Sequence, residues 1–174
     1  MLLDLTKVGL IVFVAAVLQA AVFSSVTIVG GTPDLLLVSL VAVALLRGSI
    51  VGSAAGFFGG LLLDAATLGT LGFTSLLLTV VGYWVGRYGE TTGRDRSHAP
   101  FLAVGVVTVL YAVGALVLHF MLGEPAPARV VLVETLFQDI ALNLLLTIPV
   151  YALTRRLLRP VERPERAEGV RLVG

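Results

Sequence analysis

Two aspartates in apolar surroundings, Asp64 and Asp139, are the residues of this sequence whose type points first to chemistry. Aspartyl catalysis needs two carboxyl groups that lie close enough to share one proton. We expect Asp64 at the outer face of a membrane and Asp139 near its centre, and this difference in depth is too large for a shared proton. The sequence also lacks the G-x-S-x-G, H-E-x-x-H and phosphate-loop motifs. We therefore predict a protein that is not an enzyme.

The residue counts also argue against metal and thiol chemistry. The chain has no Cys, and its two histidines, His98 and His119, are too far apart in the sequence to form a spaced ligand motif. We expect neither a metal site nor a cofactor.

Polar residues recur at helical spacing in the last apolar segment. Four of them are spaced by four residues and share one helix face, and two more lie beside them: Thr135, Asp139, Asn143, Thr147, Glu134 and Gln138. In a helix that starts at residue 130, Asp139 lies about 15 Å along the axis and near mid-membrane. An ionisable side chain there is costly and indicates a functional position. A structural clasp between helices and a site that does chemistry both fit this polar stripe.

Glycines recur at the same spacing in an earlier segment, at Gly48, Gly52, Gly56 and Gly60. This glycine ladder presents a smooth face along which another helix backbone can approach closely. Packing within the chain and docking of a partner protein are both open interpretations.

The elements that must position these residues are membrane helices, because the composition excludes most other classes. Hydrophobic residues make up 57% of the 174, and the 19 glycines bring the apolar share to about two thirds. Only 13% of the residues are charged, about half the share in soluble proteins. A soluble enzyme, a nucleic-acid binder and a disordered protein are excluded.

Six apolar segments predict an all-α, polytopic bundle in one domain over residues 1–153, followed by a basic tail over 154–174. The expected transmembrane helices cover residues 8–29, 35–46, 49–63, 71–86, 99–122 and 130–153. Residues 35–63 could instead form one long helix with a buried Arg47. Two short helices are preferred, because an arginine at mid-membrane costs several kcal/mol.

The placement of charge predicts that both termini face the cytoplasm. With six helices, eleven of the twelve Lys and Arg residues lie on the inner side, and only Arg129 lies outside. This is the asymmetry expected of a multi-pass protein. The tail is interpreted as an anchor to anionic membrane lipids, or alternatively as a docking segment.

Short motifs precede and follow the glycine ladder. Pro33 and Asp34 suit the first turn of a helix, and Asp64 either caps the next helix or pairs with Arg129. In order, the runs are Pro33-Asp34-Leu35, Leu46-Arg47-Gly48, Gly56-Phe57, Gly60-Leu61-Leu62-Leu63-Asp64 and Leu68-Gly69-Thr70-Leu71-Gly72, with Gln19 in the first helix. This series resembles the rod shape-determining protein MreD family over about residues 17–88.

The resemblance implies a non-enzymatic scaffold of the cell-wall elongation machinery in the bacterial inner membrane. Its implied partners are the single-pass protein MreC, a RodA-type glycosyltransferase, a class B penicillin-binding transpeptidase and, indirectly, MreB filaments. The residues carried over serve helix geometry or partner docking: Gln19, Pro33, Asp34, Arg47, Gly56, Gly60, Asp64, Gly69 and Gly72.

A second interpretation is the substrate-binding membrane subunit of an energy-coupling-factor vitamin transporter. Such subunits also have six helices and an A-x-x-x-A motif in the first, which Ala16 and Ala20 match. The polar stripe would then line a ligand pocket. The short outer loops contain few aromatic residues to close such a pocket, so the scaffold is preferred.

Overall fold

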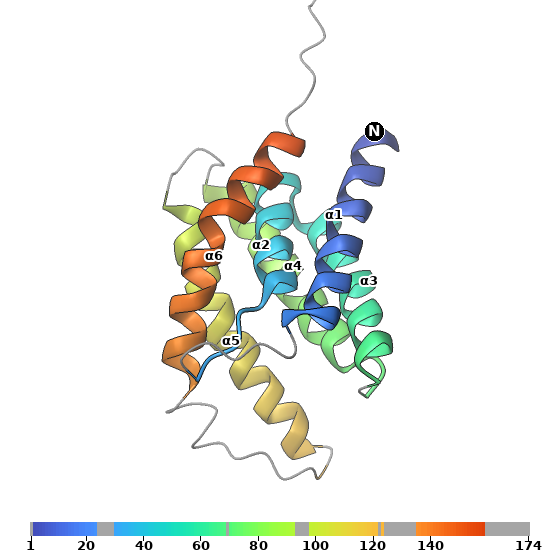
Figure 1. The fold of residues 1–174 in the computed structure, drawn as a ribbon. Coiled ribbons are helices and arrows are strands. Elements are labelled where there is room, and N and C mark those ends of the chain that lie inside the picture. Colours follow the sequence, from blue (N-terminus) through green and yellow to red (C-terminus); the bar gives the residue numbers. More distant parts are fainter. Residues whose placement is uncertain are drawn as a thin grey trace, which may run out of the picture.

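Every regular element in the described part of the chain is an α-helix. The computed structural model describes residues 2–23, 30–68, 70–92, 98–121, 123 and 135–158. The helices are α1 (Leu2–Ala21), α2 (Leu35–Arg47), α3 (Ser49–Thr67), α4 (Phe73–Thr92), α5 (Ala99–Met121) and α6 (Leu136–Leu157), and they form one bundle (Figure 1). Four of them are long and apolar enough to cross a membrane, and α2 is a shorter apolar helix. The predicted all-α polytopic bundle is confirmed.

Helix α2 lies at the centre of this bundle and contacts each of the other five helices (Figure 1). All residues from Leu36 to Leu45 are buried, as expected of a helix that is apolar on every side. Its 13 residues correspond to about 20 Å, which is less than the roughly 30 Å of a hydrocarbon core. One end of α2 must therefore lie inside the membrane.

A single residue, Gly48, joins α2 to α3. Its φ of +92° lies in the left-handed region, which glycine adopts without steric cost. A Cβ at this position would also collide with the side chain of Glu90. Residues 35–63 are therefore two helices, with Arg47 at the end of the first.

Arg47 ties three helices together at one end of the bundle. Its Nη2 donates to Asp4 Oδ1 of α1 at 3.1 Å and to the carbonyl oxygen of Leu158, the C-cap of α6, at 2.8 Å. A cation is favourable at a helix C-terminus. The first and last helices are thus linked through the last residue of α2.

The glycine ladder packs inside the chain, against α4. A Cβ on Gly52 would lie 2.5 Å from the carbonyl oxygen of Gly82, and a Cβ on Gly56 would collide with the carbonyl of Leu78. Glycine thus allows the two backbones to touch, and α3 and α4 form the most extensive helix pair of the bundle. In this structure the ladder is covered and is not available to a partner.

Several helix boundaries differ from the predicted ones. Helix α3 continues to Thr67 and α4 to Thr92, whereas the predicted helices ended at residues 63 and 86. A helix extends beyond its apolar stretch where the polar residues that follow also favour helical structure. In α4, Arg87 donates to Glu90 one turn later, at 3.4 Å. Helix α1 ends at Ala21 and α6 begins at Leu136, whereas residues 24–29 and 130–134 lie outside the described part.

Glu90 lies near the end of α4, after its apolar part, and caps the start of α3. Its Oε1 accepts from the backbone N–H of Ser49 at 2.8 Å and from the Ser49 hydroxyl at 3.0 Å. The backbone hydrogen bond, followed by the hydroxyl, keeps the pKa of Glu90 below its ordinary value. The carboxylate form is therefore the one that joins α4 to α3.

We expect Gly56→Ala to lower the free energy of unfolding by about 1–3 kcal/mol, because the added methyl group pushes α3 away from α4. Gly105→Ala on α5 is the matched control, because a Cβ there meets nothing within 4 Å. It should be neutral or stabilising by up to about 1 kcal/mol. Unfolding in mixed detergent micelles measures both variants, and equal effects would contradict the close packing.

We expect the stabilising effect of Glu90 to depend on pH. A carboxylate whose pKa is lowered by folding stabilises the native state above its unfolded pKa, and this contribution is lost as the pH falls through its folded pKa. The melting temperature of the wild type should exceed that of Glu90→Gln near neutral pH, and the two should converge under acid. Circular dichroism melts test this, and a difference independent of pH would argue against a carboxylate cap.

Candidate functional site

Helix α2 begins inside the bundle, where side chains from two other helices bind its backbone. Asp34 is the N-cap and accepts from the Leu37 N–H at 2.9 Å. From α1, Gln19 Oε1 accepts from the Leu35 N–H at 2.7 Å. From α6, Asn143 Oδ1 accepts from the Asp34 N–H at 2.8 Å. We call Gln19, Asp34 and Asn143 the α2 cap; it satisfies donors that have no partner within the helix.

Asn143 also connects the α2 cap to α5. Its Nδ2 donates to Thr108 Oγ1 at 3.2 Å, and only 2% of the residue is exposed. One turn later, the Thr147 hydroxyl donates to the carbonyl oxygen of Asn143 within α6, at 2.6 Å. This part of the polar stripe is therefore a clasp between α2, α5 and α6.

Asp139 holds the segment that leads into α2. The backbone N–H of Thr32 donates to Asp139 Oδ1 at 2.8 Å. We call residues 30–34 the strap, which passes the start of α6 before it enters α2 (Figure 1). A Cβ on Gly31 of the strap would lie 2.7 Å from the Cβ of Gln138, so the strap lies directly against α6.

The structure places Asp139 near the start of α6. Helix α6 begins at Leu136, so Asp139 lies in its first turn and not ten residues along a helix from residue 130. The mid-membrane position of Asp139 was inferred from a helix that starts at residue 130, and it stays a prediction. Asp139 bonds to a backbone amide of the strap and to the side chain of Thr135, and both are structural contacts.

Asp64 caps α4, one of its two predicted roles. It is 3% exposed, and its carboxylate accepts from three backbone N–H groups, of Gly72 at 2.9 Å, Thr74 at 3.1 Å and Ser75 at 3.4 Å. Arg129, the alternative partner, lies outside the described residues. Asp64 and Asp139 bind different segments of the chain.

The structure brings only some of the predicted site residues together. Gln19, Asp34 and Asn143 meet at the α2 cap, and the Gln19 Nε2 also donates to the carbonyl oxygen of Pro33 at 3.4 Å. Arg47 lies at the opposite end of α2. Gly69 and Glu134 lie outside the described residues. Within the described ranges no group of three His, Cys, Asp or Glu side chains could hold a metal ion.

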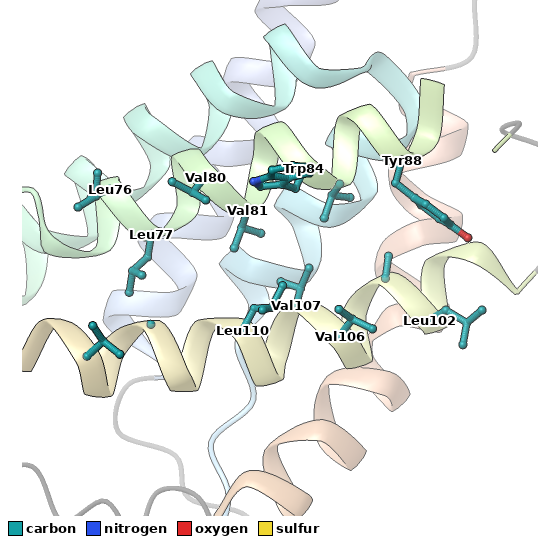
Figure 2. Close-up of a pocket in the computed structure, with 14 residues that line it drawn as sticks. Leu76, Leu77, Val80, Val81, Trp84, Tyr88, Leu102, Val106, Val107 and Leu110 are labelled. Atoms are coloured by element: carbon teal, nitrogen blue, oxygen red, sulfur yellow. The ribbon is translucent and has the colours of Figure 1, made fainter. Parts of the chain in front are cut away.

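A long apolar groove between α4 and α5 is the feature that sequence reasoning missed (Figure 2). Its volume is about 940 Å³, and its walls are side chains such as Leu76, Val80 and Trp84 of α4 and Val106 and Leu110 of α5. Trp84 is 65% exposed and Val106 is 58% exposed. Lipid-facing and groove-facing side chains are equally apolar, so the sequence carries little signal for it.

Comparison with known proteins gives one match. The family model described as rod shape-determining protein MreD matches residues 4–157. This range begins within the first turn of α1 and includes the other five helices, whereas the motifs of the sequence extend only to about residue 88. No curated protein and no solved structure matches the chain.

We expect Asn143→Leu to destabilise the fold by about 1–3 kcal/mol, because it leaves the Asp34 N–H buried without an acceptor. Thr147→Val is the matched control, one turn away and equally buried. Its hydroxyl bonds only to a carbonyl of its own helix, so its loss should cost about 1 kcal/mol or less. Unfolding titrations of the two variants test the α2 cap, and equal losses would count against it.

Proposed function

The chain belongs to the MreD family of rod shape-determining membrane proteins, and we propose that it is a non-enzymatic scaffold that binds an MreC-like protein. In this role it would hold MreC in the elongation machinery and so help to regulate lateral peptidoglycan synthesis. The observation that supports this most is the groove between α4 and α5 (Figure 2). The family is one of shape-determining proteins, which associate with the cell-shape machinery.

The groove has dimensions that suit one transmembrane helix. Its lining residues extend from Leu76 to Tyr88 on α4 and from Leu102 to Val117 on α5, which is about 18–22 Å of helix length. Helices in lipid associate through close packing and not through apolar burial. Small residues in the α5 wall, Ala103 and Gly114, permit such an approach. A single-pass partner such as MreC supplies one helix of this kind.

The distribution of charge supports the proposed topology, with six crossings of the inner membrane and both termini in the cytoplasm. The described basic residues are Lys7 near the start of α1, and Arg47, Arg87, Arg155 and Arg156 near the ends of α2, α4 and α6. The contacts of Arg47 with Asp4 and Leu158, and of Glu90 with Ser49, place these helix ends together. Positive charge at one end is expected to face the cytoplasm.

The further partners that we propose are a RodA-type glycosyltransferase and a class B penicillin-binding transpeptidase, with MreB filaments linked indirectly. The exposed apolar sides of α1 and α6 offer area for membrane-embedded partners, as at Phe13 and Leu145. The vitamin-transporter alternative is not favoured, because Asp139 and Asn143 bind the strap and the α2 backbone and line neither the groove nor the cleft described below.

We expect Val106→Trp and Val80→Trp, each of which fills the groove, to weaken co-purification with an MreC-like partner about tenfold or more. An overpacked helix interface loses about 1–3 kcal/mol, and 1.4 kcal/mol corresponds to about tenfold in affinity. Both valines are at least half exposed, so the isolated protein should still fold. Affinity purification from membranes that contain both proteins, with quantitative blotting, measures the effect.

Leu145→Trp and Leu153→Trp on α6 are the controls, because both leucines are exposed and lie outside the groove. These variants should retain the partner at wild-type level. If the groove variants and the α6 variants retain equal amounts of partner, the groove is not the binding site.

A further inference from the structure

We propose that a second cleft, between α5 and α6 at the basic end of the bundle, binds the headgroup of an anionic phospholipid. The cleft has a volume of about 290 Å³ and is lined by Pro100 and Phe101 of α5 and by Ile148, Tyr151, Arg155 and Arg156 of α6, among others. It is separate from the groove, and the proposal does not depend on partner binding. The volume accommodates a phosphate ester but not a whole lipid, whose acyl chains would lie outside it.

Three positive features converge on this cleft. Arg155 and Arg156 both line it, and within the described ranges neither forms an ion pair with a carboxylate. The third feature is the N-terminus of α5, which carries partial positive charge and has no acidic residue in its first turn. Two guanidinium groups and a helix N-terminus together form a site for a phosphate group.

Apart from Thr147 and Tyr151, the remaining wall of the cleft is apolar, and part of it is exposed. Phe101 is 39% exposed and Ile148 is 58% exposed. Ile148 precedes Arg155 by two helical turns, which is about 10 Å along the axis. A ligand in contact with both residues has its charge at the membrane surface and its hydrocarbon part below, as a phospholipid does.

The position of the cleft favours a lipid over an acidic protein segment. It lies at the end where the described basic residues gather, which is the side expected to face the anionic cytoplasmic leaflet. An acidic protein segment in solution would make no favourable apolar contact with the exposed Ile148 and Phe101. A bilayer lipid engages both parts of the cleft without leaving its leaflet.

The test is native mass spectrometry of the full chain in detergent, with added phosphatidylglycerol, phosphatidylcholine or glycerol phosphate. We expect bound phosphatidylglycerol to persist when detergent is removed in the gas phase, and the other two probes to be lost. The double variant Arg155→Gln/Arg156→Gln should weaken binding about thirtyfold, since each arginine near an anionic surface contributes about fivefold. Ile148→Gln should weaken lipid binding as well.

The double variant Lys7→Gln/Arg87→Gln is the control. It removes two positive charges from the same end of the bundle but leaves the cleft intact, so its lipid affinity should stay within twofold of the wild type. The proposal is overturned if both double variants weaken binding equally, because attraction to the surface would then explain it. It is also overturned if glycerol phosphate binds as tightly as the lipid, because the apolar wall would then contribute nothing.

Discussion

A backbone amide inside a membrane must find a partner within the protein, because no water is present to bind it. This constraint acts most strongly on α2, which is too short to bring both of its ends to the membrane surface. Its first amides are bound by its own N-cap and by side chains of α1 and α6. Gln19 and Asn143 therefore fix where α1 and α6 lie, and the arrangement of the bundle follows from the needs of one buried helix end.

The bundle is not equally tight on all sides. Helices α3 and α4 touch at backbone distance along the glycine ladder, whereas α4 and α5 are separated along much of their length by the groove (Figure 2). The basic cleft lies on the other side of α5. Helix α5 thus borders both candidate binding regions, and its polar links to the neighbouring helices include the bond between Asn143 and Thr108.

Local spacing and helix chemistry in the sequence predicted some features of this fold well. They did not predict which distant residues form contacts. The place of Asp34 at the positive end of a helix was predicted, although Pro33 and Asp34 precede the first turn and Asp34 is the N-cap. The smooth face of α3 follows from glycines four residues apart. Nothing local reveals that Asn143 binds the amide of Asp34, 109 residues earlier. The groove escaped detection for a different reason, because in lipid the same Leu and Val side chains suit an interface and a bare surface.

The dependence of α2 on α6 also bears on how the chain is synthesised. During translation α2 is synthesised well before α6. The Asp34 amide therefore cannot bind Asn143, and Arg47 cannot bind the Leu158 carbonyl, until α6 has been made. Until the last helix has been synthesised, each end of α2 lacks the contact that α6 supplies and has only those from α1 and from its own N-cap. The polar contacts at both ends of α2 can therefore be complete only after α6 has been inserted. A chain truncated before α6 would leave the Asp34 amide without its acceptor and Arg47 without the Leu158 carbonyl at the two ends of its central helix.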